Sequence, residues 1–192
     1  MSAHHLIIGE TVDFITGEVI QNTHDEQYRQ KLAEFLVETC GYRRSDLTRR
    51  LPVIAKAGDK RATVILDFAV RLSDRYLMTL QYGPGSLVTR HRSGLALSRI
   101  LAGHYIPLVV VTNGEDADIL DGRTGAVIGS GLDGIPSRSR LTALAETADF
   151  RKVPDKQLEL ESRILYAFLI DDSCPCDDIE GISACRPISP GE

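Results

Sequence analysis

The segment that most restricts the fold is a run of three apolar, β-rich stretches separated by very short polar turns. The stretches are LPVIAK at 51–56, RATVILDFAVRL at 61–72 and RYLMTLQY at 75–82. The intervening residues, 57–60 and 73–74, leave room only for direct reversal of the chain. The sequence therefore predicts three consecutive antiparallel strands.

A helix and a fully apolar stretch follow these strands. SGLALSRILAG at 93–103 has helical periodicity, and IPLVVVTNG at 106–114 is the continuous apolar run typical of a strand buried on both faces of a sheet. Parallel neighbours in a sheet are joined by such a helical crossover. The predicted fold class is therefore α/β, with a mixed β-sheet and flanking helices.

The remaining predicted elements flank this core. They are a hairpin at 11–22, a helix at 23–40 capped by Thr23 or Asp25 and stopped by Gly41, a second hairpin at 117–130, and helices at 137–147 and 155–170 capped by Ser137 and Asp155. Both hairpins contain the pattern D-x-x-T-G-x-V-I, which predicts two similar turns. We expect a single domain over 1–172, with its core at about 24–130, and a mobile, cysteine-containing tail at 173–192.

Composition and motifs exclude several classes of protein. No apolar run approaches the roughly 18 residues of a membrane span, and no secretory signal is evident, so a cytoplasmic location is expected. The four cysteines would then be reduced thiols. Cys174, Cys176 and Cys185 could instead bind zinc, but they lack the second CxxC or histidine pair of a strong site. Nucleotide-binding, serine-hydrolase and HExxH motifs are absent.

Charge is distributed unevenly along the chain. The net charge of −5 argues against nucleic-acid binding by bulk electrostatics alone. Within residues 43–99, however, Lys and Arg outnumber Asp and Glu by 12 to 4. This segment could be a set of solvated cationic loops or a surface for nucleic acid.

One carboxylate interrupts the apolar second strand. Asp67 stands in VILDFAV, where a buried strand would normally have another Val or Ile. A carboxylate in such a place costs free energy unless it is paired, hydrogen-bonded or bound to a metal. One interpretation is an ion pair with Arg29 or Arg61 that fastens the first helix to the sheet.

Three stretches in order suggest a second interpretation. The helix start DEQYRQ, the strand ILDFAV and the strand PLVVVTNG together resemble the N-terminal nuclease-like domain of the restriction subunit of type I restriction enzymes, in the PD-(D/E)xK nuclease superfamily. The resemblance covers roughly residues 24–130 and implies a restriction-endonuclease-like core. In such nucleases an aspartate on one strand converges with a D/E-x-K pair on the next, because alternate residues share a face.

The resemblance assigns catalytic positions to this chain. It implies that Asp67 is the aspartate and that Thr79 and Gln81 stand where the D/E-x-K pair would lie, without its acid and lysine. Mg²⁺ would be held by Asp67 and Glu26, and Gln81 could still orient a water. Glu26 could equally be an acid favoured by the dipole at the start of its helix.

Cations near the third strand bear on both the missing lysine and phosphate binding. Lys56 or Lys60 could substitute for the lysine from the neighbouring strand. After the Gly83–Gly85 turn, the resemblance places Arg90, His91, Arg92 and Arg99 at the rim of the cleft as nucleic-acid-binding residues. The alternative is that this segment is a solvated loop.

Two functions follow from these observations. We expect a nuclease-like domain with a degenerate active site, acting as a binding module for DNA, another nucleic acid or a partner protein. The alternative is an active Mg²⁺-dependent endonuclease that cleaves DNA phosphodiester bonds. The helicase-type motor of full restriction subunits is not found in this sequence, so we expect any translocation to require another chain.

Overall fold

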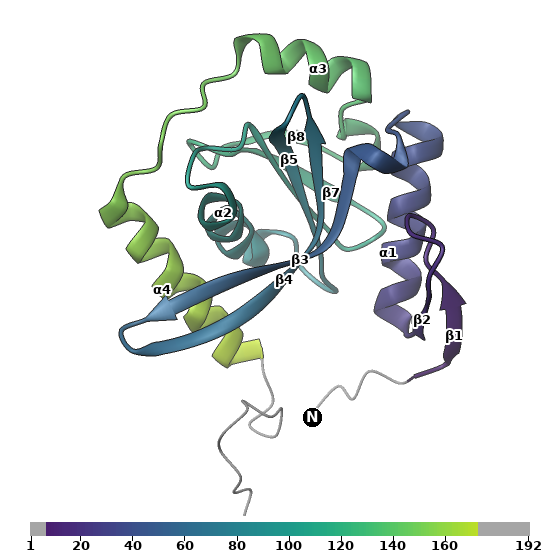
Figure 1. Cartoon of the computed structure of the whole chain (residues 1–192), viewed down its shortest axis with the longest axis horizontal. Helices are drawn as coiled ribbons and strands as arrows, with labels where there is room; N and C mark the ends of the chain where they lie inside the picture. The colour runs from purple at the N-terminus through teal and green to yellow at the C-terminus, as the bar shows by residue number, and fades with distance from the viewer. Residues whose placement is uncertain (1–6, 173–192) are drawn as a thin grey trace, which may run out of the picture.

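A six-stranded sheet lies at the centre of the molecule, with helices on both faces (Figure 1). The computed structural model describes residues 7–172. The strands are β3 (Leu47–Ala57), β4 (Lys60–Leu72), β5 (Arg75–Tyr82), β6 (Leu108–Thr112), β7 (Ala117–Asp121) and β8 (Val127–Ser130), in that order across the sheet. Only β5 and β6 pair in parallel, and the other neighbours are antiparallel. The predicted α/β class with a mixed sheet is confirmed.

The crossover helix that makes the parallel pair possible is α2 (Val88–Ala102), which Gly103 ends with a positive φ of 67°. It begins five residues earlier than the periodicity predicts. The apolar stripe begins only at Gly94 and Leu95, which are buried, whereas the preceding polar residues are partly or fully exposed. Arg90, His91 and Arg92 therefore belong to the start of the helix, and the expectation that they form a loop before it is wrong.

Two layers of helices cover the sheet. On one face lie α1 (His24–Glu34), its continuation as a π-helical turn, η1 (Phe35–Thr39), and α3 (Arg138–Thr147). Their buried side chains pack against strand residues such as Phe68, Val70 and Leu80. On the other face, α2 and α4 (Asp155–Asp172) pack against β3 and β4. The centre of the sheet is therefore buried on both sides, whereas exposed residues lie on the edge strand β8 and on the β3–β4 hairpin, which extends beyond the rest of the sheet (Figure 1).

Helix termini follow most of the predicted caps. Thr23, rather than Asp25, caps α1, because its hydroxyl accepts a hydrogen bond from the Glu26 amide. Ser137 caps α3 in the same way. Asp155 is the first residue inside α4 and binds Lys152 at 2.7 Å. Cys174, Cys176 and Cys185, with the predicted mobile tail, lie outside the described residues.

The remaining short elements are β1 (Gly9–Val12), β2 (Val19–Asn22), η2 (Arg44–Asp46) and η3 (Leu132–Gly134).

The β1–β2 hairpin and the β7–β8 hairpin have turns of the same kind. Asp13 Oδ1 accepts the Thr16 amide at 2.7 Å, and Asp121 Oδ1 accepts the Thr124 amide at 2.6 Å. The next residue in each turn is glycine, with φ of 77° and 76°. The prediction of two similar turns is confirmed.

Candidate functional site

Asp67 lies where β4 and β5 separate. The backbone ladder between these strands ends at Phe68 and Leu80. Beyond that point side chains bridge the strands: the Asp67 amide donates to Gln81 Oε1 at 3.3 Å, and the Tyr82 amide donates to Asp67 Oδ2 at 2.7 Å. The carboxylate therefore satisfies a backbone group that the departing strand leaves without a partner.

The alternation of β4 changes phase at this point. Leu66 and Ala69 pack with α2 and α4, whereas Phe68 and Val70 pack in the cluster that includes α1 and α3. Regular alternation would place Leu66, Phe68 and Val70 on one face. The irregularity occurs at Asp67, whose carboxylate points toward α1 as predicted.

Arg29 of α1 is the ion-pair partner of Asp67. Arg29 Nε lies 2.5 Å from Asp67 Oδ1, and Arg29 Nη1 lies 3.7 Å from Glu26 Oε2. Asp67 and Glu26 are both only 4% exposed, so one guanidinium joins two buried carboxylates. Of the two ion-pair partners expected for Asp67, Arg29 is therefore the one found. Arg61 lies six residues away along β4, a distance of about 20 Å.

The network extends from Glu26 to the N-terminal hairpin. Gln30 Nε2 donates to Glu26 Oε1 at 2.8 Å and to Asp13 Oδ2 at 2.9 Å. Arg49 of β3 forms an ion pair with Asp13, and Arg50 Nη1 lies 3.4 Å from Glu26 Oε2. Three carboxylates and three guanidiniums from α1, β3, β4 and the hairpin thus form one continuous cluster.

Burial and charge act in opposite directions on these groups. Burial raises the pKa of Asp67 above its ordinary 3.8, against the lowering effects of the Arg29 charge and the Tyr82 amide. Burial also acts against the charged form of Arg29, but the hydrogen bond to Asp67 and the charges of Asp67, Glu26 and Asp25 together outweigh it and raise the pKa of Arg29. Burial, with Asp25 nearby, raises the pKa of Tyr82 to about 12. Arg29 therefore stays cationic and makes the largest contribution that favours ionised Asp67.

The arrangement does not fit Mg²⁺. Both oxygens of Asp67 already accept hydrogen bonds, from Arg29 and the Tyr82 amide, and Glu26 faces Gln30, Arg29 and Arg50. A hard divalent cation needs several oxygen ligands, and a guanidinium beside both carboxylates opposes it electrostatically. Within residues 7–172 there is no group of three His, Cys, Asp or Glu side chains placed to hold a metal.

The pairing register of β4 and β5 places Gln81, and not Thr79, beside Asp67. Thr79 pairs with Ala69 on the face covered by α2, and its hydroxyl is buried with no hydrogen-bond partner among the described residues. Gln81 is the residue opposite Asp67, and it also donates to the Ile65 carbonyl at 3.5 Å. Thr79 is therefore separated from the carboxylate, and Gln81 takes the position nearest to it.

Arg90 fills the space where a side chain at position 83 would lie. A Cβ built on Gly83 would be 2.3 Å from the guanidinium carbon of Arg90. Arg90 Nη2 donates to the Pro84 carbonyl at 2.9 Å. Gly83 directly follows the end of β5, so α2 places a cation beside that strand end. Lys56 and Lys60, in contrast, lie at the tip of the β3–β4 hairpin, too far from Asp67 to replace a lysine there.

The other predicted rim cations have partners inside the protein. Arg99 is 6% exposed and donates to Glu161 of α4, at 2.6 Å, and to two backbone carbonyls. Arg92 also pairs with Glu161, and His91 Nε2 lies 2.7 Å from Asp118. The expectation that Arg99 lies on an exposed rim is therefore wrong, because Glu161, 62 residues later, draws its guanidinium inward.

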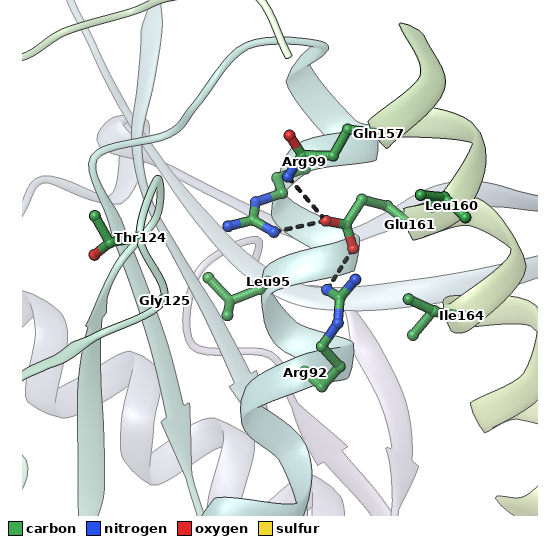
Figure 2. Close-up of a pocket in the computed structure, with 9 residues that line it drawn as sticks. All are labelled: Arg92, Leu95, Arg99, Thr124, Gly125, Gln157, Leu160, Glu161 and Ile164. Carbon is green, nitrogen blue, oxygen red and sulfur yellow. Dashed lines mark hydrogen bonds and ion pairs between the residues drawn. The ribbon is translucent and has the colours of Figure 1, made fainter. Parts of the chain in front are cut away.

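Glu161 lies between the two arginines of α2 in an open pocket of about 490 Å³ (Figure 2). Burial alone would raise the pKa of Glu161, but hydrogen bonds and charges from Arg92 and Arg99 outweigh it and hold the pKa below its usual value. The pocket is lined by Arg92, Leu95, Arg99, Thr124, Gly125, Gln157, Leu160, Glu161 and Ile164. Both arginines of this pocket pair with the single Glu161 carboxylate, so these ion pairs join α2 to α4.

A known protein family matches the part of the chain that contains Asp67. The family described as the type I restriction enzyme R protein N terminus matches residues 24–136. The chain belongs to this family. The R-protein match spans α1 and the whole six-stranded sheet, and it therefore contains Asp67, Glu26, Arg29 and Gln81. The N-terminal hairpin, α3 and α4 lie outside it. No curated protein and no solved structure matches the chain.

No helix within residues 7–172 is long and apolar enough to cross a membrane.

Proposed function

We propose that this chain is a nuclease-like domain with a degenerate active site, which binds nucleic acid in the cytoplasm without cleaving it. The observation that carries this proposal is the guanidinium of Arg29, which contacts the two carboxylates that a catalytic metal would need. Membership in the R-protein family supports an origin as a nuclease domain. The contacts of Arg29 with Asp67 and Glu26 support the loss of metal-dependent phosphodiester cleavage.

The other positions of the site agree with this proposal. Gln81 is neutral and bridges β4 and β5, and Gly83 has no side chain to hold or activate a water. Phosphodiester hydrolysis requires stabilisation of the charge that develops on phosphate oxygens, together with an activated water. The side chains around Asp67 supply cations for binding but no base that is not already paired.

Phosphate binding would use the cations at the edge of the site. Arg50 is 54% exposed and has a positive φ of 52°, a conformation that costs a non-glycine residue free energy. Arg90, in the first turn of α2 and beside the end of β5, is partly exposed, as its assignment as a phosphate contact requires. Guanidinium groups suit phosphate oxygens because they can donate two hydrogen bonds in one plane.

Cleavage is tested with supercoiled plasmid and either Mg²⁺ or Mn²⁺. We expect no more nicking by the wild type than by Asp67→Ala. Metal-dependent cleavage that disappears in Asp67→Ala, with the circular dichroism spectrum unchanged, would overturn the degenerate site and establish an Mg²⁺-dependent endonuclease.

Binding is tested by fluorescence anisotropy with a labelled duplex between about 50 and 200 mM salt. Loss of two phosphate contacts in Arg50→Ala/Arg90→Ala should reduce the log–log salt slope by about 1.8. The matched control is Arg71→Ala/Arg75→Ala, which removes the same charge at the opposite end of β4 and β5. Equal losses in both variants, or no binding at low salt, would favour a protein partner instead.

A further inference from the structure

The β3–β4 hairpin extends beyond the rest of the sheet. Residues 60–67 of β4 have no backbone pairing with β5, so 51–57 and 60–66 pair only with each other among the strands (Figure 1). The β3 edge of this ribbon is fixed to α4, because the Lys56 amide donates to Ser162 Oγ at 2.6 Å. The extension is therefore a supported two-stranded ribbon.

The two faces of the ribbon differ. Val53, Ala55 and Leu66 pack toward α2 and α4. On the opposite face lie three cross-strand pairs whose six side chains are all exposed: Pro52–Ile65, Ile54–Thr63 and Lys56–Arg61. Ile54 is 53% exposed and Ile65 is 39% exposed. This face continues into Asp67. At its β3 edge, Ile54 and Lys56 border an open pocket together with α4 residues such as Ser162.

The exposed face is cationic at its outer end. Lys56 and Arg61 face each other there, whereas Lys60, the first residue of β4, alternates to the other face of the ribbon. None of the three forms an ion pair within residues 7–172, in contrast to Arg92 and Arg99 of α2. The basic residues of 43–99 that form no ion pair within residues 7–172 therefore include those at this end of the ribbon. Its charge complements a polyanion.

We propose that the exposed face of the ribbon inserts into the major groove of duplex nucleic acid. The major groove of B-DNA, about 12 Å wide, admits a two-stranded β-ribbon. Two strands lie about 5 Å apart, and seven residues extend roughly 23 Å, enough to follow a groove with side chains on one face. Lys56 and Arg61 contact phosphates, while Ile54 and Thr63 contact base edges. This inference rests on the proposed function and names its ligand and surface.

The first test compares matched double variants by anisotropy with labelled duplex. Lys56→Ala/Arg61→Ala should reduce the log–log salt slope by about 1.8 and lower affinity at least tenfold near 0.1 M salt. The control Arg140→Ala/Lys156→Ala removes the same charge from exposed residues of α3 and α4 and should change affinity less than twofold. Similar effects of both pairs would overturn the ribbon as the docking surface. Binding of nucleic acid would then still stand.

The second test places a photo-crosslinking amino acid at position 54 and, as control, at position 128. Ile54 and Ile128 are similarly exposed, at 53% and 58%, but Ile128 lies on β8 at the opposite edge of the sheet. We expect cross-links to duplex only from position 54, with single strands weaker. Cross-links from both positions would overturn groove insertion. Competition in which polyglutamate displaces the labelled duplex as effectively as unlabelled duplex does would also overturn it. Absence of any duplex binding by the wild type would overturn both proposals.

Discussion

Replacing Arg29 with methionine removes one half of a buried ion pair and leaves Asp67 without its cation. The side chains of Arg29 and Asp67 are 23% and 4% exposed, and their atoms lie 2.5 Å apart. Breaking a buried pair by removing one partner costs about 3–5 kcal/mol, because a charge stays buried without compensation. Since Arg29 is partly solvated, we expect a loss near the lower end, about 3 kcal/mol at neutral pH.

The loss should depend on pH. Burial already raises the folded-state pKa of Asp67 above 3.8, and removing Arg29 takes away an effect that lowers it. Below the unfolded-state pKa the carboxyl is protonated in both states, so the variant is affected little. As pH rises toward 7, the unfolded chain ionises while burial opposes ionisation in the folded variant, and the deficit grows.

Urea unfolding followed by far-ultraviolet circular dichroism at pH 7 and near pH 4 measures this effect. Asp67→Asn/Arg29→Met should be less destabilised than the sum of its single variants, by about 1–3 kcal/mol. The control Arg71→Met breaks an exposed pair with Asp74 and should cost no more than about 1 kcal/mol. A loss below about 1 kcal/mol for Arg29→Met, or the same loss at both pH values, would refute the reasoning.

Two further predictions concern α4 and the loop after β7. Glu161→Ala should cost about 3–5 kcal/mol at neutral pH by urea unfolding, far more than Arg92→Ala, whose side chain is 42% exposed. Because the folded-state pKa of Glu161 is lowered, its stabilisation is lost as pH falls through that pKa, and the deficit of Glu161→Ala should shrink in acid. Gly122→Ala should lower the free energy of unfolding by about 3 kcal/mol, because its Cβ would lie 1.8 Å from the Ile106 carbonyl oxygen. Gly131→Ala has open space around the new Cβ and should lower it by about 1 kcal/mol, because its φ is positive. Thermal or urea unfolding measures both. Equal losses within either pair would contradict these assignments.

The fold was predictable because its signals are local. Short turns, a continuous apolar strand and helical periodicity defined the strands and the crossover. The start of α2 was missed because its first residues are polar and partly exposed, so no apolar stripe marked them. Strand positions and the mixed sheet thus followed from local pattern, while the start of α2 could not be located because exposed polar residues carry no apolar periodicity.

The site was only partly predictable. An acid in an apolar strand pointed to Asp67, family resemblance pointed to Glu26, and Arg29 was one of the two ion-pair partners expected for Asp67. The register around Gln81 was not predictable, because it depends on where β4 leaves β5 and a shift of pairing changes every neighbour. The position of Arg99 depended on Glu161, far along the chain, which no local pattern indicates.

The order of strands in the sheet has a consequence for how the chain folds. Each strand neighbours the next one in sequence, so β3–β5 and β6–β8 form two local meanders. Only the β5–β6 pair, separated by residues 83–107, requires closure of a loop longer than a turn. Loop-closure entropy is therefore concentrated in one step. Asp67, Gln81 and Tyr82 all lie in the first meander, so we expect their mutual contacts to form before that closure.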